Sequence, residues 1–236
     1  MMLNLRKIAV FITLFAGITS LSFADTLYSI STSLTRLSEQ YPDENYGRDL
    51  DGISLNMMLN HYNGNSPLGW FIRTSVGGVT TGYEWTETDT TSVSVYSSTD
   101  IKISVGPSFR IRAGSLIQIP ISIGPVFSNY REEENGYWAM DYDYTLPGSY
   151  GSSGYYEAFN LGVLGDAAIV INPFTWLTII NGITVSWDFM RWEKGYNNSS
   201  LISRNTSGQF KSVNYSAFTV GLYFGIGIRF GDTNSQ

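Results

Sequence analysis

The sequence predicts an all-β protein, an eight-stranded antiparallel up-and-down transmembrane β-barrel with short periplasmic turns and four long outer loops. Three observations favour this fold class. Apolar residues alternate with small or polar residues along eight segments, the period expected of strands. The connections between these segments are alternately long and short. Six charges within the segments fall on the small, polar face.

Composition narrows the class of protein further. The chain has 236 residues, of which 15% are aromatic and only 14% are charged, whereas soluble domains carry about 25% charged residues. The absence of cysteine excludes a disulfide scaffold, a thiol nucleophile and a zinc–thiolate site. The net charge of −6 argues against a nucleic-acid partner, because binding phosphates requires a basic surface.

The N-terminus has the pattern of a secretory signal peptide. Arg6 and Lys7 precede an uncharged, mainly apolar run over residues 8–18, and Ser22 and Ala24 are small residues before Asp25. The apolar run is short for a transmembrane anchor. We therefore expect a signal peptide over residues 1–24 and an outer-membrane barrel domain over residues 25–236.

The first four expected strands cover residues 27–37, 50–62, 68–81 and 101–111. In the first strand, Tyr28, Ile30 and Leu34 alternate with three serines. The next three strands alternate in the same way and present these apolar residues on one face: Ile53, Leu55, Met57 and Leu59; Trp70, Ile72 and Val76; Ile101, Ile103, Val105, Phe109 and Ile111.

The last four expected strands cover residues 116–130, 159–171, 176–192 and 213–230. Pro120 and Pro125 exclude a helix over the first of these. The apolar faces of the four strands are Ile117, Ile119, Ile121, Ile123 and Phe127; Leu161, Val163, Ala167 and Ile169; Leu177, Ile179, Ile183, Val185, Trp187 and Phe189; Phe218, Val220, Leu222, Phe224, Ile226, Ile228 and Phe230.

The connections predict an up-and-down order. Those over residues 63–67, 112–115 and 172–174 are short, and those over residues 40–49, 84–100, 131–157 and 193–212 are long and polar. Antiparallel strands would then place all four long loops at one end, the outer one. Both termini would lie at the other, periplasmic end.

Charge decides which face points outward. Six charges within strands share the face that carries glycine and serine, and they are Arg73, Lys102, Arg110, Asp166, Asp188 and Arg229. A charge facing lipid at the midplane costs roughly 2–4 kcal/mol, so the apolar face is expected to meet lipid. Aromatic residues at both ends of that face fit two interfacial girdles, Trp70, Phe109 and Phe230 at one end and Phe127, Phe159, Phe189 and Phe218 at the other.

On these features the chain resembles a small eight-stranded bacterial outer-membrane barrel of the OmpX, OmpA or OmpW type, and its Tyr- and Asn-rich loops are similar to those of spirochaete-type small barrels. The resemblance covers residues 25–236 but is architectural. Its best local element is the last strand, Phe218–Phe230, which ends in an aromatic residue. The resemblance implies outer-membrane lipids as surroundings and recognition of the last strand by the assembly machinery. Six residues follow Phe230, which departs from that pattern.

Two sets of residues are candidates for function. The six lumen charges are expected to form a structural network that fills the barrel; an anion-leaning polar path is the alternative. The longest loop is expected to be exposed and to recognise a host or surface ligand, or to be merely solvated. Its candidate residues are Glu132, Glu133, Glu134, Tyr137, Trp138, Asp141, Tyr142, Asp143 and Tyr144.

Catalysis has little support in the sequence. His61, the single histidine, is expected to be an exposed residue at the periplasmic end, and no partner motif accompanies it. We expect no cofactor and no metal site, since the acids lack calcium-loop spacing. The expected function is a non-enzymatic structural or surface-interaction barrel in the outer membrane of a diderm bacterium. The alternatives are a narrow pore or transporter for small or apolar solutes, and a soluble periplasmic lipocalin-like binder.

Overall fold

A computed structural model describes residues 25–42, 46–87, 90–141, 148–196 and 209–231. Side chains are described for residues 25–42, 49–78, 98–132, 157–194 and 209–231. The expected signal peptide, residues 1–24, lies outside the described residues. Among the described residues, no helix combines the length and the apolar character needed to cross a bilayer.

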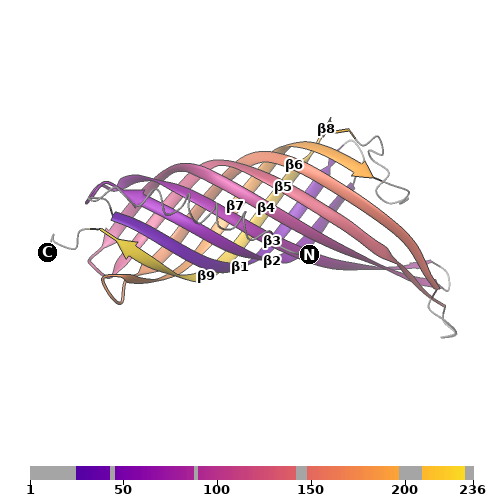
Figure 1. Ribbon diagram of the computed structural model, residues 1–236, viewed down its shortest axis with the longest axis horizontal. Coiled ribbons are helices and arrows are strands. Elements are labelled where there is room, and N and C mark those ends of the chain that lie inside the picture. Colours follow the sequence, from indigo (N-terminus) through magenta and orange to yellow (C-terminus); the bar gives the residue numbers. More distant parts are fainter. Residues whose placement is uncertain (1–24, 43–45, 88–89, 142–147, 197–208, 232–236) are drawn as a thin grey trace, which may run out of the picture.

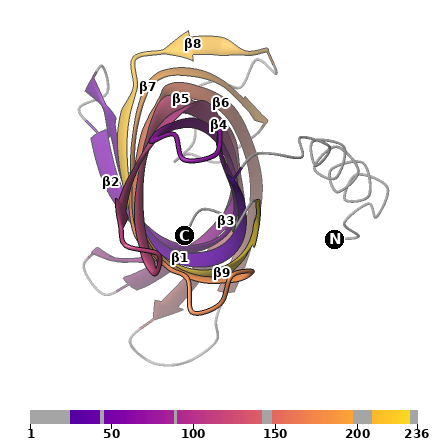
Figure 2. The ribbon, with the colours of Figure 1, turned by 90° about the vertical axis from the view of Figure 1, so that its left-hand side faces the viewer.

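The described chain is almost entirely antiparallel sheet (Figure 1). From β1 to β7 each strand pairs with the next along the chain, β7 pairs with β9, and β9 pairs with β1, which closes the ring seen end-on in Figure 2. The short β8 pairs with β7 beyond the end of β9, so eight strands form the wall. The strands are β1 (Asp25–Tyr41), β2 (Tyr46–Tyr62), β3 (Leu68–Glu87), β4 (Thr90–Ala113), β5 (Ile117–Asp141), β6 (Gly148–Ile171), β7 (Leu177–Tyr196), β8 (Lys211–Val213) and β9 (Ser216–Phe230). The eight-stranded up-and-down barrel is therefore confirmed.

The three short connections lie at one end of the barrel, as predicted. The same end holds the start of β1 and the end of β9, because Thr26 pairs with Phe230. Gly64 and Gly114 lie in two of the turns with φ of +53° and +73°, a left-handed conformation that glycine adopts without steric cost.

The four long loops of the prediction need correction, because the strands continue through most of them. β5 extends to Asp141 and β6 begins at Gly148, so the segment expected to be a loop over residues 131–157 is mainly paired strand. Residues 40–41 likewise pair with residues 46–47, residues 84–87 pair with residues 90–93, and β7 continues to Tyr196. The prediction ended strands where the apolar alternation stops, but hydrogen bonding continues above the apolar band.

Inside the barrel, apolar groups form small separate clusters. Phe71, Val126 and Leu164 form one, and a second holds Leu27, Ala168, Val170, Ile180 and Tyr223. Polar and charged side chains occupy the levels between and beyond these clusters. The interior thus consists of apolar clusters and of charged groups joined by hydrogen bonds. The charged groups form the candidate site.

Candidate functional site in the barrel lumen

The outer face of the wall is apolar and the inner face is polar, as the sequence predicted. Large apolar side chains face outward and retain between 36% and 69% exposure, and they include Ile30, Leu34, Ile53, Ile101, Ile123, Phe127, Ile169, Leu222 and Phe224. Serines of the same strands, such as Ser31 and Ser54, are buried inside. Only a lipid surrounding makes this inverted arrangement favourable. The fold is a transmembrane β-barrel. A lipocalin-like binder would carry its apolar face inward, so that alternative is wrong.

The described side chains form four charged layers in the lumen, numbered from the short-turn end. The first centres on Asp25, the first residue of β1. Its carboxylate accepts hydrogen bonds from Arg110 and from Arg229, whose Nε lies 2.7 Å from Oδ1, and Arg112 lies 3.0 Å away. Arg110 also donates to the carbonyl oxygens of Gly64 and Ser66. This layer therefore ties β1, β4 and β9 to the turn between β2 and β3.

The second layer is a buried ion pair between Arg73 on β3 and Asp166 on β6. The hydroxyl of Tyr223 donates to Asp166 Oδ1 over 2.9 Å, and the Arg73 guanidinium lies 4.6 Å from the Tyr223 ring centre. Arg73 also donates to Asn56 Oδ1 over 3.1 Å. A Cβ on Gly182 would lie 2.4 Å from the Tyr223 ring, so the glycine provides the space that this tyrosine occupies.

The third layer joins Lys102 to two carboxylates. Its Nζ lies 3.2 Å from Asp100 Oδ2 and 4.0 Å from Asp188 Oδ2, and it donates to Thr219 Oγ1 over 3.3 Å. Asp188 is 2% exposed. This layer therefore shares one ammonium between two acidic groups.

The fourth layer closes the lumen toward the outer end. Arg191 lies 3.0 Å from Glu39 Oε1 and 3.4 Å from Glu193 Oε2, and all three side chains are buried. The Tyr215 hydroxyl donates to Glu39 over 2.9 Å, and its ring lies 4.3 Å from the guanidinium carbon. The Tyr130 ring also faces this carbon at 5.2 Å. Cation–π contacts of this kind stabilise a guanidinium that has left water.

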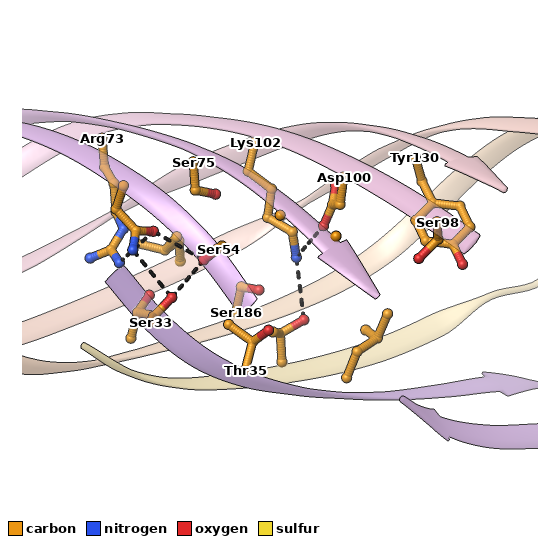
Figure 3. A pocket seen from close by; sticks show the side chains of 17 residues that line it. Ser33, Thr35, Ser54, Arg73, Ser75, Ser98, Asp100, Lys102, Tyr130 and Ser186 are labelled. Carbon is orange, nitrogen blue, oxygen red and sulfur yellow. Dashed lines mark hydrogen bonds and ion pairs between the residues drawn. The ribbon is translucent and has the colours of Figure 1, made fainter. Parts of the chain in front are cut away.

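A cavity of about 60 Å³ lies beside Arg73 of the second layer and around Asp100 and Lys102 of the third (Figure 3). Many of the lining residues carry a hydroxyl or a charge, although most of the accessible lining is carbon; they include Ser33, Thr35, Ser54, Ser75, Ser98, Asp100, Lys102, Thr184, Ser186 and Thr219. A cavity of this size has room for a few water molecules. Ser33 and Ser54 share a hydrogen bond of 2.5 Å on one side of it.

All six charges singled out from the sequence point into the lumen. Arg73 meets Asp166, Lys102 meets Asp188, and Arg110 and Arg229 meet at Asp25. The sequence reasoning missed Asp25, Glu39, Asp100, Arg191 and Glu193, which complete these layers. Three of them could have been found by extending the alternation, since Asp25 and Glu39 are in phase with Ser29 and Asp100 is in phase with Lys102.

The other two missed residues depend on a β-bulge. Leu161 pairs with Met190 and Gly162 with Asp188, so Phe189 is an extra residue of β7. Phe189 and Met190 both face outward, and Arg191 follows them on the inner face. Strict alternation from Asp188 would have placed Arg191 outside.

The candidate recognition loop is mostly not a loop. Glu132 is buried and accepts a hydrogen bond of 2.6 Å from the Tyr130 hydroxyl, so the expectation that it is surface-exposed is wrong. Glu133, Glu134, Tyr137, Trp138 and Asp141 belong to the outer end of β5. Tyr142, Asp143 and Tyr144 lie outside the described residues.

His61 lies on the outer face at the short-turn end, but it is not exposed as predicted. It is 7% exposed, its Nδ1 lies 3.0 Å from Thr26 Oγ1, and its ring packs against Trp70 at 5.0 Å. The prediction treated a residue beside a turn as solvated, whereas the adjacent strands supply it with neighbours. Among the described residues, no group of three or more His, Cys, Asp or Glu side chains could hold a metal ion.

Exposed charges mark where the apolar band ends. On β1 and β2 the last outward apolar pair is Leu34 with Ile53, and the next row holds Arg36 and Asp51. Arg36 donates to Asp49 over 2.9 Å, and this hydrogen bond holds the pKa of the Asp49 carboxyl below its usual value. The row of Arg36 therefore lies at the outer boundary of the lipid.

Comparison with known proteins finds likeness of fold only. No family model and no curated protein matches the chain. Ail, the attachment invasion locus protein of Yersinia pestis, is 16% identical over 86% of this chain and 98% of its own, with a TM-score of 0.37. The outer membrane protein OprG of Pseudomonas aeruginosa is 10% identical, with a TM-score of 0.44 and coverage of 89% and 98%. The outer membrane protease OmpT of Escherichia coli is 10% identical, with a TM-score of 0.38 and coverage of 90% and 99%. Similarity at this level assigns no activity.

Proposed function

We propose that the chain is a non-enzymatic outer-membrane protein of a diderm bacterium that binds a host or surface ligand through a protruding sheet. The observation that carries this proposal is that some strands of the wall extend farther toward the outer end than others. Pairing between β2 and β3 ends at Gly78, but β3 continues beside β4 to Glu87. At about 3.4 Å per residue, β3 extends roughly 30 Å along its own direction beyond its last pair with β2.

The protruding sheet, defined as residues 79–87, 90–99, 133–141 and 148–155, has four strands. β4 pairs with β5 up to Asp141, and β5 pairs with β6 up to Gly148. Within the described residues, β3 beyond Gly78 has a pairing partner on one side only. Such an edge can accept an extended peptide through backbone hydrogen bonds.

The composition of the protruding sheet supports binding. It is rich in tyrosine, serine and glycine, and its charged residues are Glu84, Glu87, Glu133, Glu134 and Asp141. Tyrosine supplies large contact area at low entropic cost, and serine and glycine adapt to a partner. The five acids favour a partner with a basic surface.

The filled lumen favours surface interaction over transport. Arg73 and Arg191 are buried in ion pairs of the second and fourth layers. A solute crossing the barrel would have to separate both pairs, and separating a buried pair is costly. We therefore rank a narrow pore second. Conductance measurements on the purified barrel test this function.

The test removes the protruding sheet and keeps the wall. Residues 79–98 and 133–155 are each replaced by Asn-Gly, a dipeptide that connects paired strands in a tight turn. The cuts fall at Gly78–Thr99 and Glu132–Tyr156, which are paired positions. Cells carrying the full or shortened barrel are then measured for adhesion to immobilised laminin and fibronectin and for binding to a glycan array.

We expect the shortened barrel to lose adhesion and to keep its heat-dependent shift on SDS gels, which reports a folded barrel. The matched control is Arg36→Gln with Asp49→Asn, which alters the opposite rim and should leave adhesion unchanged. A folded shortened barrel that adheres as well as the full chain would refute the proposal.

A further inference from the structure

Positive charge is in excess at the short-turn end of the lumen. The first charged layer holds three arginines, Arg110, Arg112 and Arg229, which form the arginine cluster. Their shared ionic partner is the carboxylate of Asp25. Three guanidinium groups and one carboxylate give this layer a net charge of +2.

No second acidic side chain among the described residues pairs with the arginine cluster. The three short turns contain no acidic residue, and the second layer is an ion pair with no net charge. The other hydrogen bonds of the cluster go to neutral groups. Arg110 donates to the carbonyl oxygens of Gly64 and Ser66, and Arg112 donates to Asn65 Oδ1 over 2.6 Å. These bonds orient the guanidinium groups but do not cancel their charge.

The three guanidinium groups converge, and two of them are accessible to water. Arg112 Nη2 lies 3.0 Å from the Asp25 carboxylate, Arg229 Nε lies 2.7 Å from it, and Arg110 Nη1 contacts the same group. The side chain of Arg110 is 1% exposed, whereas those of Arg112 and Arg229 are 30% and 21% exposed. The cluster therefore has one arginine fixed inside the lumen and two at its opening.

Both arginines at the opening retain N–H groups without a partner among the described residues. Arg229 donates to Asp25 through Nε and Nη2, and Arg112 donates through Nη1 and Nη2. Nη1 of Arg229 and Nε of Arg112 remain for another acceptor. A guanidinium presents its donors in a planar fork that matches the oxygens of a phosphate group.

We propose that the arginine cluster binds a dianionic phosphate, as inorganic phosphate or a phosphate monoester, at the open side of Arg112 and Arg229. A phosphate monoester carries about −1.5 to −2 charges at pH 7, which offsets the excess of +2. A carboxylate or a phosphodiester headgroup of a lipid carries a single negative charge and offsets only half of it. The site lies at the opposite end from the protruding sheet, so its test is independent of the proposed function.

Equilibrium dialysis against radiolabelled inorganic phosphate measures this binding directly. The full chain is purified in a nonionic detergent at slightly alkaline pH, where phosphate is mainly dianionic, and sodium chloride keeps the ionic strength constant. We expect a single phosphate per chain. At a phosphate concentration about ten times Kd, the unfolding equilibrium constant in a urea titration should fall roughly tenfold.

Competition identifies the charge of the ligand. Methyl phosphate, a monoester, should displace the labelled phosphate. Dimethyl phosphate, a diester with one negative charge, should not displace it at the same concentration. Equal displacement by the diester would overturn the dianion assignment and favour a phospholipid headgroup as the occupant.

The variant Arg112→Gln makes the location specific. It should weaken phosphate binding by at least about tenfold, because it removes one charge and its hydrogen bonds to the anion. Arg112 is the most exposed of the three arginines, so the variant should keep the heat-dependent gel shift of a folded barrel. The matched control is Arg36→Gln, which removes an exposed arginine at the outer rim and should bind phosphate as the unmodified chain does.

Three results would overturn the proposal. No retained phosphate, with equal stability in phosphate and chloride, would mean that the cluster only ties strands together. Unchanged binding by Arg112→Gln would place the phosphate elsewhere in the molecule. Binding that appears only in Asp232→Asn would mean that this carboxylate, which lies outside the described residues, occupies the cluster instead.

Discussion

At the scale of single residues, the barrel interior depends on pairing rather than on hydrophobic burial. Arg73 and Asp166 are both almost fully buried and lie 93 positions apart in the chain. Burying either charge without the other would destabilise the fold, because a buried charge loses its hydration. Only the opposite charge and hydrogen bonds from the protein can compensate for that loss. Tyr223 and Asn56 complete those bonds. The pair therefore specifies how β3 and β6 face each other across the lumen.

A double-mutant cycle tests this pairing. Arg73→Met and Asp166→Asn should each lower the free energy of unfolding by about 3–5 kcal/mol, since each leaves one buried charge uncompensated. The double variant should lose clearly less than the sum of the two. Urea titration of the detergent-solubilised barrel provides the measurement.

The exposed pair of Arg36 and Asp49 is the matched control for that cycle. Both side chains are more than half exposed, so solvent screens their attraction. Arg36→Met and Asp49→Asn should show no measurable coupling. Strict additivity at Arg73 and Asp166 as well would contradict the pairing argument.

At the scale of elements, β9 shows how one strand serves two environments. Its outward residues from Phe218 to Phe230 are nearly all apolar, and its inward residues include three glycines beside Tyr223 and Arg229. Gly225 has no room for a Cβ, which would lie 2.2 Å from the Ile30 carbonyl oxygen. The small inner residues let the wall close tightly at the β1–β9 seam.

An arginine scan along the outward face of β9 should report its depth in the bilayer. Phe224→Arg lies at the middle of the strand and should cost about 2–4 kcal/mol, and Phe230→Arg at the short-turn end should cost about 0–1 kcal/mol. The measurement is the free energy of unfolding in phospholipid vesicles. A flat profile along the strand would mean that this face does not meet lipid.

At the scale of the whole molecule, the barrel is a closed wall around a filled interior. Closure leaves no unpaired strand edge within the lipid, and the protruding sheet presents its edge above the lipid. The four charged layers bridge strands that do not pair in the wall, as Arg191 on β7 does with Glu39 on β1. Wall and filling therefore stabilise each other.

The filled lumen predicts that the purified barrel does not conduct. In a planar lipid bilayer it should produce no discrete conductance steps, because Arg73 and Arg191 hold buried ion pairs in the second and fourth layers. A large-pore porin in the same bilayer serves as the positive control. Steady unitary steps from the purified chain would show an open path and favour the pore alternative.

The sequence by itself determined the number of wall strands, the direction of each face and the six lumen charges first identified. These follow from local chemistry, because alternation, proline and charge placement can be read within one strand. Only the tertiary structure decided the partners of those charges, since Arg73 and Asp166 meet across the lumen at a distance in sequence that no local pattern encodes. It also extended β3–β6 beyond the apolar band, where backbone hydrogen bonds persist without a hydrophobic signal. Finally, the bulge at Phe189 turned Arg191 and Glu193 inward, because one extra residue reverses every face that follows it.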